Sequence, residues 1–352
     1  MRRSLFAVAI AALLVACGSL RAEELVYTRF ADYIEALRVQ SGIPGLAAAV
    51  IGRNEVLWQR SFGYQNVERG MPMRSDTPAS LDGLTQVVTS AMVLRCVEEG
   101  RLSLDQTIGE FDPQTPEPAA TLRQLLAHTS GPSNAPVFLY HPERVEAIAP
   151  AIEACTGMSF RESVADLLDR LAMADSVPGP DALEVPWPLD PDPELRLARY
   201  SARLERLATP YFVDTPRRAA PTQYTVTTLG PSKGLLASAL DLAQFDLALR
   251  RGLLVQTETL IGAWRAPVDS TGKALPHGLG WFVQQYNGEP VVWQFGMSTG
   301  PGSSSLIVTL PARGITLVLL ANSNGLTRPF PLSGGDVTTS PFGRVFLALF
   351  TR

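Results

Sequence analysis

Hydrophobic residues recur at helical spacing near the start of the chain and then give way to strand-like runs. Between residues 24 and 40 an apolar residue returns every three or four positions, which predicts an amphipathic helix. Two short apolar segments follow at 46–51 and 55–62, and the residues between them, 52–54, suit a hairpin turn. We therefore expect a helix that packs on a local antiparallel pair of strands. The apolar positions of this helix are Val26, Phe30, Ile34 and Leu37.

The middle of the chain, residues 81–249, has mainly helical periodicity, interrupted by proline-rich loops around 113–118 and 178–193. One helix face is formed by Phe160, Val164, Leu167, Leu168 and Leu171. After Gly278 strand-like segments return, with Gly or Pro between them. These segments are 279–286, 290–295, 303–310 and 315–321.

This order of elements predicts a mixed α/β (α+β) fold in which a sheet is built from both ends of the chain. The helical stretch is then an insert within the sheet. We place the sheet lobe at about 24–80 and 251–352, and the all-helical lobe at about 81–250. The mature chain is expected to form one unit with these two lobes.

The composition is that of an ordinary globular protein, with 46% hydrophobic and 18% charged residues among 352. A net charge of −4 and the lack of a basic run argue against binding to nucleic acid. The chain has only two lysines, Lys233 and Lys273. Lysine is therefore scarce as a catalytic base.

The first residues are typical of an export signal, because Arg2 and Arg3 precede an apolar run over 5–16 that is too short to span a bilayer. The sequence Leu14-Val15-Ala16-Cys17 resembles a bacterial lipobox. We expect a signal peptide at 1–16 and a mature chain, 17–352, anchored by lipid on Cys17 as a periplasmic lipoprotein. Cleavage after Ala22 is the alternative.

Two further cysteines, Cys96 and Cys155, lie in helix-like stretches. An oxidising compartment permits a disulfide between them, and two buried thiols are the other reading. The sequence leaves this choice open.

Five segments in a fixed order together carry a resemblance to a known family. They are Ile43-Pro44-Gly45-Leu46, Phe62-Gly63-Tyr64, Val97-Glu98-Glu99-Gly100-Arg101-Leu102, Leu125-Leu126-Ala127-His128-Thr129-Ser130-Gly131 and Gly278-Leu279-Gly280-Trp281. The chain resembles class C β-lactamases, their DD-peptidase relatives and related esterases over almost its whole mature length. The resemblance implies a β-lactamase/transpeptidase-like fold, an antiparallel sheet flanked by helices, and an active site between the sheet and an all-helical lobe.

The resemblance also implies acyl transfer by three motifs, of which the first is Ser-x-x-Lys at the start of a helix. The three-residue offset puts the serine nucleophile and its lysine base on one helix face. In this chain the motif falls on Gly83-Leu84-Thr85-Gln86. Both the nucleophile and the base are therefore absent.

The other two motifs are also degenerate. Tyr-x-Asn falls on Tyr140-His141-Pro142, so Tyr140 alone is kept and Pro142 replaces the asparagine. An ordinary core or surface tyrosine is the alternative at this position. Lys-Thr-Gly or His-x-Gly falls on Gly296-Met297-Ser298, so Gly296 replaces the cation and Ser298 the small glycine.

Hydroxyl groups near the first motif are candidates for a displaced nucleophile. They are Ser80, Thr85, Thr89 and Ser90, and helix capping or lining is their ordinary role. Lys233 is a long-range candidate for a replacement base, with an ordinary surface lysine as the alternative.

Residues 296–300 spell the Gly-x-Ser-x-Gly pattern of a nucleophile elbow, but strand-like segments flank them on both sides. An elbow needs a strand followed by a helix, so we expect a coincidence. The three histidines, His128, His141 and His277, and the remaining cysteines show no metal-ligand spacing. We expect a structural role for His128, and neither a metal nor a cofactor.

Two hypotheses follow. The first is a catalytically silent or strongly impaired pseudoenzyme that acts as an envelope binding or regulatory lipoprotein, with a peptide, a cell-wall fragment or an envelope protein as its partner. The second is an active serine hydrolase, an esterase, amidase or D-Ala-D-Ala peptidase, with a displaced nucleophile such as Ser80 or Ser298.

Overall fold

The computed structural model describes residues 24–129, 136–298, 300 and 302–351. The predicted signal segment 1–16 and Cys17 lie outside these residues. A helix covers 24–40, as its periodicity predicts. Within the described residues, no helix has both the length and the apolar character needed to cross a membrane.

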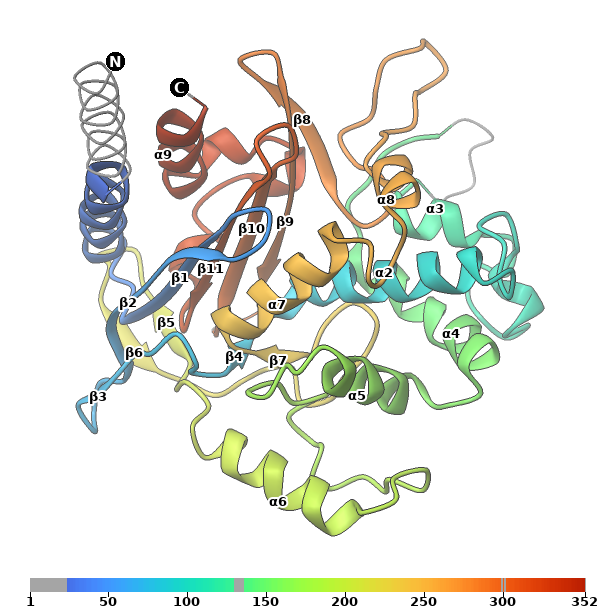
Figure 1. The fold of residues 1–352 in the computed structure, drawn as a ribbon, viewed down its shortest axis with the longest axis horizontal. Helices are drawn as coiled ribbons and strands as arrows, with labels where there is room; N and C mark the ends of the chain where they lie inside the picture. Colours follow the sequence, from blue (N-terminus) through green and yellow to red (C-terminus); the bar gives the residue numbers. More distant parts are fainter. Residues whose placement is uncertain (1–23, 130–135, 299, 301, 352) are drawn as a thin grey trace, which may run out of the picture.

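Seven antiparallel strands form the central sheet in the order β3-β2-β1-β11-β10-β9-β8, so strands from the two ends of the chain meet in its middle (Figure 1). The strands are β1 (Gly45–Ile51), β2 (Val56–Asn66), β3 (Met71–Pro72), β8 (Phe282–Tyr286), β9 (Glu289–Met297), β10 (Ser304–Leu310) and β11 (Ile315–Ala321). Two small pairs accompany them: β4 (Ala79–Ser80) with β7 (Leu236–Ala237), and β5 (Tyr211–Val213) with β6 (Ala219–Pro221). The predicted antiparallel sheet is therefore confirmed.

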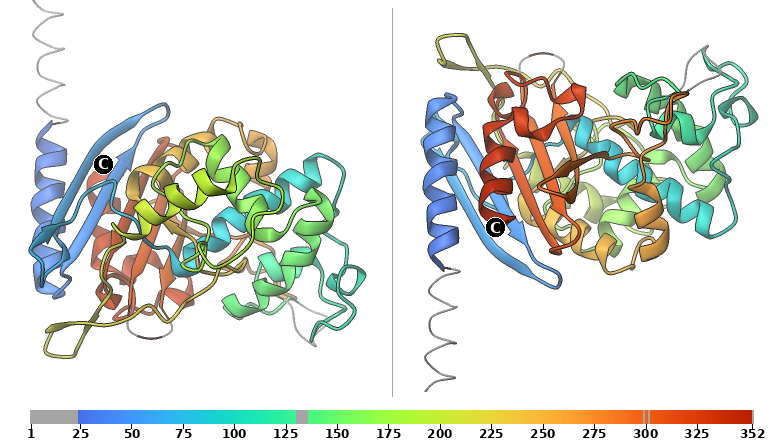
Figure 2. Two further views of the ribbon diagram at one scale, coloured as in Figure 1. Left: turned by 90° about the horizontal axis from the view of Figure 1, so that it is seen from below. Right: turned by 90° about the horizontal axis from the view of Figure 1, so that it is seen from above.

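Helices lie on both faces of this sheet (Figure 2). The α-helices are α2 (Thr85–Glu98), α3 (Leu122–Leu126), α4 (Ala149–Thr156), α5 (Phe160–Arg170), α6 (Pro193–Leu204), α7 (Ala239–Arg250), α8 (Thr257–Ala263) and α9 (Pro341–Phe350). Short 3-10 helices are η1 (Asp82–Leu84), η2 (Ile108–Glu110), η3 (Pro142–Ile148), η4 (Asn324–Leu326), η5 (Leu332–Gly334) and η6 (Val337–Thr339).

β1 is apolar along its whole length because both of its faces are buried. Leu46 and Val50 pack in the core beneath α9 and the helix over 24–40. Ala47 and Ala49 face the opposite way, into the core shared with α2 and α7. The central strands are thus covered on both sides, and α2 is held against the sheet.

One predicted strand is shorter than expected, since β8 begins at Phe282 and not at 279. Residues 278–281 instead form a tight turn in which Gly280 adopts φ 98° and the amide of Gly278 donates to the carbonyl oxygen of Trp281 at 2.8 Å. A side chain at position 280 would also meet the Ser90 side chain at 2.5 Å. Glycine at this position is therefore required by both conformation and space.

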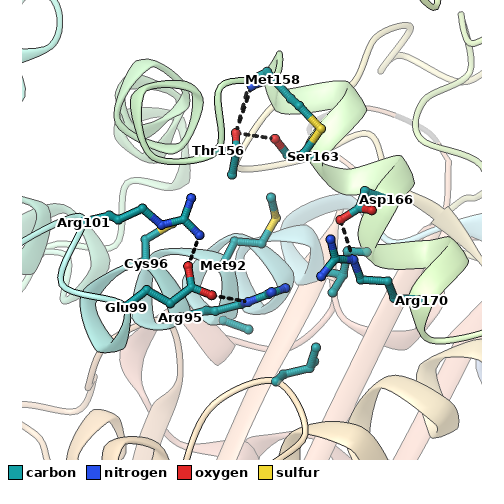
Figure 3. A pocket seen from close by; sticks show the side chains of 13 residues that line it. Met92, Arg95, Cys96, Glu99, Arg101, Thr156, Met158, Ser163, Asp166 and Arg170 are labelled. Atoms are coloured by element: carbon teal, nitrogen blue, oxygen red, sulfur yellow. Dashed lines mark hydrogen bonds and ion pairs between the residues drawn. The ribbon is translucent and has the colours of Figure 1, made fainter. Parts of the chain in front are cut away.

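α7, which falls inside the range predicted for the helical lobe, contacts β1 and β11. The lobe limits at 80 and 250 stay predictions. Away from the sheet, α2 and α5 border a pocket of about 150 Å³ (Figure 3).

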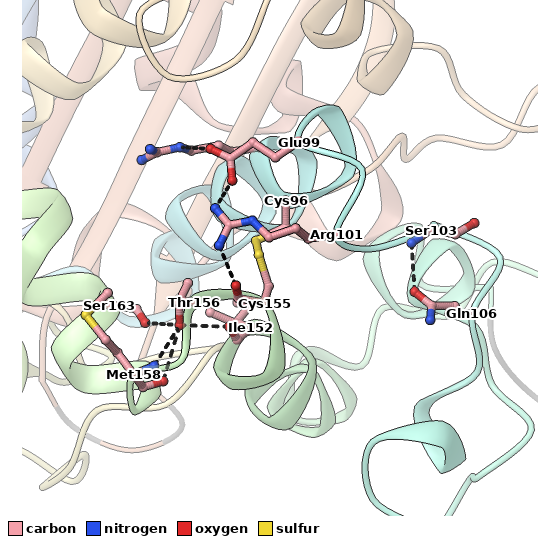
Figure 4. Close-up of a disulfide and its surroundings, with 11 residues drawn as sticks. Cys96, Glu99, Arg101, Ser103, Gln106, Ile152, Cys155, Thr156, Met158 and Ser163 are labelled. Atoms are coloured by element: carbon pink, nitrogen blue, oxygen red, sulfur yellow. Dashed lines mark hydrogen bonds and ion pairs between the residues drawn. A yellow bond between two sulfur atoms is a disulfide. The ribbon is translucent and has the colours of Figure 1, made fainter.

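A disulfide between Cys96 and Cys155 joins the last turn of α2 to the end of α4 (Figure 4). Of the two readings that the sequence left open, a disulfide and two buried thiols, the structure has the disulfide. The guanidinium of Arg101 donates to the carbonyl oxygen of Cys155 at 2.5 Å, so a second bond spans the same junction. A cross-link of this kind is typical of oxidising compartments.

Candidate functional site

Gly83 lies in η1, directly before α2, and the residues of the first two motifs meet there. A β-carbon added at Gly83 would lie 3.5 Å from Nε2 of Gln86 and 3.5 Å from the hydroxyl oxygen of Tyr140. It would also lie 3.1 Å from the carbonyl oxygen of Phe295 on β9. The structure thus brings the positions of nucleophile, base and motif tyrosine together.

Gln86 occupies the position of the lysine base and makes three hydrogen bonds. Its Nε2 donates to the carbonyl oxygen of Gly83 at 3.0 Å and to the hydroxyl oxygen of Tyr140 at 3.2 Å. Its Oε1 lies 3.0 Å from Nε2 of His128, which must carry the proton because the amide oxygen only accepts. Every polar atom of the buried Gln86 side chain is therefore used.

The chain of hydrogen bonds continues beyond Tyr140. The Tyr140 hydroxyl donates to Oε1 of Gln294 at 3.5 Å, a long bond, and Nε2 of Gln294 lies 3.3 Å from Nε2 of His277. Nδ1 of His277 donates to the carbonyl oxygen of Gly278 at 2.7 Å, so its Nε2 is free to accept. Each group donates to the next, in the order His128, Gln86, Tyr140, Gln294 and His277.

All the titratable members of this chain are held in their neutral forms. Burial, reinforced by the neighbouring His277, keeps the pKa of His128 well below its usual value. Burial lowers the pKa of His277 to about 3 and raises the pKa of Tyr140. The five hydrogen-bonded side chains therefore carry no charge near neutral pH, and none of them offers an ionised base to position 83.

The third motif lies at the end of β9 and has no room for a cation. A β-carbon on Gly296 would lie 2.0 Å from the carbonyl oxygen of Leu81 and 2.3 Å from Oγ of Ser305. Met297 points to the other side of the sheet and is 40% exposed. A lysine or histidine at 296 would require Ser305 and η1 to move.

Asp82, next to Gly83, is a buried carboxyl that the sequence reasoning missed. It has φ 47° and accepts hydrogen bonds from Ser303 at 2.6 Å and from Ser298 at 3.3 Å. Burial raises the pKa of Asp82 to about 6, against the opposing effect of these hydroxyls and of Lys233. Its signal in the sequence was an acidic residue inside the apolar stretch 79–84.

The candidate hydroxyls near the first motif bind backbone groups. Thr89 donates to Pro231 and Ser90 to Leu279, at 2.7 and 2.5 Å. Ser80 and Thr85 are buried and accept from backbone amides at 3.4 Å. These contacts are the ordinary structural role of such hydroxyls.

The remaining candidates lie outside the chain of hydrogen bonds at Gln86. Ser298 follows β9, and β10 begins at Ser304, so the strand-to-helix elbow is absent there. Pro142 is the first residue of η3, where its fixed φ suits the helix start. Among the described residues, no three His, Cys, Asp or Glu side chains are grouped so as to hold a metal ion.

The fold is that of the serine β-lactamase and penicillin-binding protein class. A sequence model of the β-lactamase family matches residues 30–333, and the chain belongs to this family. The resemblance expected from the five sequence segments is therefore confirmed.

Two relatives show how the family varies. Esterase EstB from Burkholderia gladioli is 37% identical over 120 residues, 32% of this chain and 30% of EstB. The mitochondrial serine beta-lactamase-like protein LACTB of Homo sapiens is 25% identical over 107 residues, 28% of this chain and 20% of LACTB. These matches span less than a third of either relative, so neither activity transfers directly.

Solved structures agree with the fold over nearly the whole chain. A structure described as SurE has a TM-score of 0.70 at 21% identity, covering 93% of this chain and 76% of that one. A class C β-lactamase has a TM-score of 0.68 at 15% identity, covering 91% of this chain and 95% of that one. At such identities the likeness establishes the fold alone.

Proposed function

We propose that this protein is a catalytically silent member of the β-lactamase family that binds a ligand or a protein partner at the family's active-site position. The observation that carries the proposal is Gly83, which places no hydroxyl beside Gln86 and Tyr140. A serine hydrolase forms a covalent intermediate on that hydroxyl. Without it, the first step of acyl transfer has no attacking atom.

The surroundings of Gly83 support the same conclusion. The Tyr140 hydroxyl accepts a hydrogen bond from the Gln86 amide and donates one to Gln294, so it is poorly placed to take a proton from a nucleophile. Loss of a serine nucleophile or of its paired base lowers turnover by about 10⁶, and the two losses overlap. Binding without turnover is what such a site retains.

We further propose that the protein acts outside the cytosol as a lipid-anchored envelope protein. The export signal and Cys17 in the sequence support this location, and the disulfide supports an oxidising compartment. A peptide, a cell-wall fragment or an envelope protein is the partner that fits this location. Acylation of Cys17 is tested by metabolic labelling with a clickable fatty acid, with Cys17→Ser as control; an unlabelled wild-type protein would remove the anchor from the proposal.

Covalent probes test the catalytic part of the proposal. Purified protein is treated with a fluorophosphonate and with a fluorescent penicillin, beside an active esterase of the same family, and intact masses are measured. We expect no adduct on this protein and full labelling of the active enzyme. A stoichiometric serine adduct on the wild-type chain would overturn the proposal.

One observation favours a second candidate function, an active hydrolase with a displaced nucleophile. Ser298 donates to the Asp82 carboxylate at 3.3 Å, so a hydroxyl and a potential base lie together near Gly83. Ser298 is only 3% exposed, however, and its hydroxyl hydrogen is directed at the carboxylate and not at an open surface. Substrate access therefore requires this end of β9 to move.

Turnover of p-nitrophenyl esters, nitrocefin and D-Ala-D-Ala peptides separates the two candidates. We expect no turnover above that of heat-inactivated protein. If turnover appears, Ser298→Ala and Ser80→Ala identify the nucleophile, and loss in Ser298→Ala alone would establish the second candidate.

A further inference from the structure

The pocket between α2 and α5 lies away from the site at Gly83. Its volume, about 150 Å³, is close to that of an apolar cavity known to hold one benzene molecule. The apolar part of its lining consists of Ala91, Met92, Met158, Leu167 and Leu254. Figure 3 shows Met92 in the middle of the pocket, with Met158 above it. The size and lining fit a single six-membered ring.

Charged side chains surround this apolar lining and carry one positive charge in excess. They are Arg95, Arg101 and Arg170 together with Glu99 and Asp166. Glu99 accepts from Arg95 at 3.0 Å and also pairs with Arg101, so two guanidinium groups share one carboxylate. Each guanidinium has five donors, which leaves N–H groups for a second anion.

The opposite side of the pocket offers a weaker ion pair. Arg170 contacts Asp166 at 2.7 Å, and the two side chains are 54% and 37% exposed. Exposed pairs of this kind contribute little, so an incoming carboxylate exchanges readily for Asp166. Figure 3 places Arg170 on one side of Met92 and Arg101 on the other. Cations thus stand on both sides of the apolar centre.

We propose that this pocket binds a monoaromatic carboxylate, with the ring against the two methionines and the carboxylate at the arginine rim. Thioether sulfur makes favourable contacts with aromatic rings, and guanidinium groups are attracted to ring faces. Arginine also binds carboxylates through two parallel hydrogen bonds. A ring therefore suits this lining better than an aliphatic chain of equal volume, and an anion suits it better than a cation.

The pocket lies farther along α2 than the first site. The lining residue nearest in sequence, Ala91, follows Gly83 by eight positions, a rise of at least about 12 Å along a helix. The proposal therefore stands or falls independently of catalytic silence at Gly83.

Calorimetric titration of the full-length protein with phenylacetate tests the proposal. Benzyl alcohol serves as the neutral probe and 2-phenylethylamine as the cationic one. We expect phenylacetate to bind with a dissociation constant of about 1 mM or tighter, and the other two probes at least about tenfold more weakly.

Two matched variants locate the site. Arg170→Gln removes a rim cation from an exposed pair four residues apart, and Arg218→Gln does the same at the pair with Asp214, which is not part of the pocket. We expect phenylacetate binding to weaken about tenfold in Arg170→Gln and to stay unchanged in Arg218→Gln. Ala91→Leu, which fills the pocket, should abolish binding, with thermal melting as a check on folding.

Three results would overturn the proposal. The first is the absence of saturable phenylacetate binding to the wild-type protein. The second is equal weakening in Arg170→Gln and Arg218→Gln, which would show a general effect of net charge. The third is binding of 2-phenylethylamine as tight as that of phenylacetate.

Discussion

Introducing a nucleophile at position 83 tests the proposed catalytic silence of this site and the cause that we propose for it. The backbone of Gly83 is outside the left-handed region, so a side chain is conformationally tolerated there. An added β-carbon meets the Phe295 carbonyl oxygen at 3.1 Å, and that oxygen must shift by a few tenths of an ångström. We estimate a penalty of about 1 kcal/mol for this crowding in Gly83→Ser.

The serine hydroxyl would then lie within reach of Tyr140 and residue 86, because its β-carbon is 3.5 Å from a polar atom of each. Serine alone lacks a base, and nucleophile and base act as a unit. We therefore expect Gly83→Ser to stay inactive and Gly83→Ser/Gln86→Lys to gain activity. A lysine in this buried position has its pKa lowered by burial, so a neutral amine is available as base.

The assay is p-nitrophenyl ester turnover together with fluorophosphonate labelling followed by intact mass. The matched control is Gly83→Ala/Gln86→Lys, which has the same crowding and the same amine but no hydroxyl. A positioned base contributes at least about a hundredfold, so we expect a rise of that size over the control. If the double variant folds with an unchanged thermal transition and gives neither label nor turnover, the reasoning from Gly83 and Gln86 is refuted.

Three stability predictions follow from the same structure. The pKa of Asp82 is raised from 3.8 to about 6, so its carboxyl adds stability below about pH 3.8 that is lost as pH rises through about 6. This contribution is about 3 kcal/mol at full size. Urea unfolding at about pH 4 and about pH 7 measures the stability difference between the two pH values, and this difference should shrink by most of that amount in Asp82→Asn; an equal difference in wild type and variant contradicts the prediction. Cys96→Ala/Cys155→Ala opens a cross-link over 59 positions and should lower the free energy of unfolding by about 4 kcal/mol, measured against the oxidised wild type; equal stabilities contradict it. Tyr140→Phe leaves one buried N–H of Gln86 without its acceptor, while Oε1 of Gln294 keeps the Phe295 amide as a donor. It should lower the free energy of unfolding by about 1–3 kcal/mol, whereas the exposed Tyr33→Phe should change it little; equal effects would show that the hydrogen bonds of Tyr140 are not formed.

The sequence predicted most of the sheet because its signals are local. The helix over 24–40 and strands such as β10 and β11 carry periodic or continuous apolar runs bounded by Gly or Pro. β8 was predicted three residues too long, because Gly280 and the turn around it depend on contacts with α2. That contact joins segments far apart in the sequence, and no local pattern encodes it.

Spacing predicted the motif positions, and the structure brings Gly83, Gln86 and Tyr140 together, but the sequence did not predict their hydrogen-bond partners. Gln294 is a buried polar residue within the apolar run 290–295 of β9, and only the register of β9 against the neighbouring elements brings it to Tyr140. Asp82 and Ser303 are separated by 221 positions and meet because η1 packs against β9 and β10. Side-chain partners across such distances follow from topology and not from composition.

The direction of the hydrogen-bond chain makes glutamine at position 86 and its buried neighbours one mutually consistent set. Nε2–H of His128 donates to residue 86. A lysine ammonium at 86 could only donate as well, so the two groups could not hydrogen-bond until the imidazole changed its tautomer. Gln86 removes this conflict, because its oxygen accepts from His128 while its nitrogen donates to Tyr140. A neutral amide at 86 thus lets five buried groups satisfy one another without a charge, whereas a lysine at 86 must either give up its proton or face the His128 donor as a buried cation. Gly83 is compatible with that neutral state, because it adds no polar group that the buried chain of hydrogen bonds would have to satisfy.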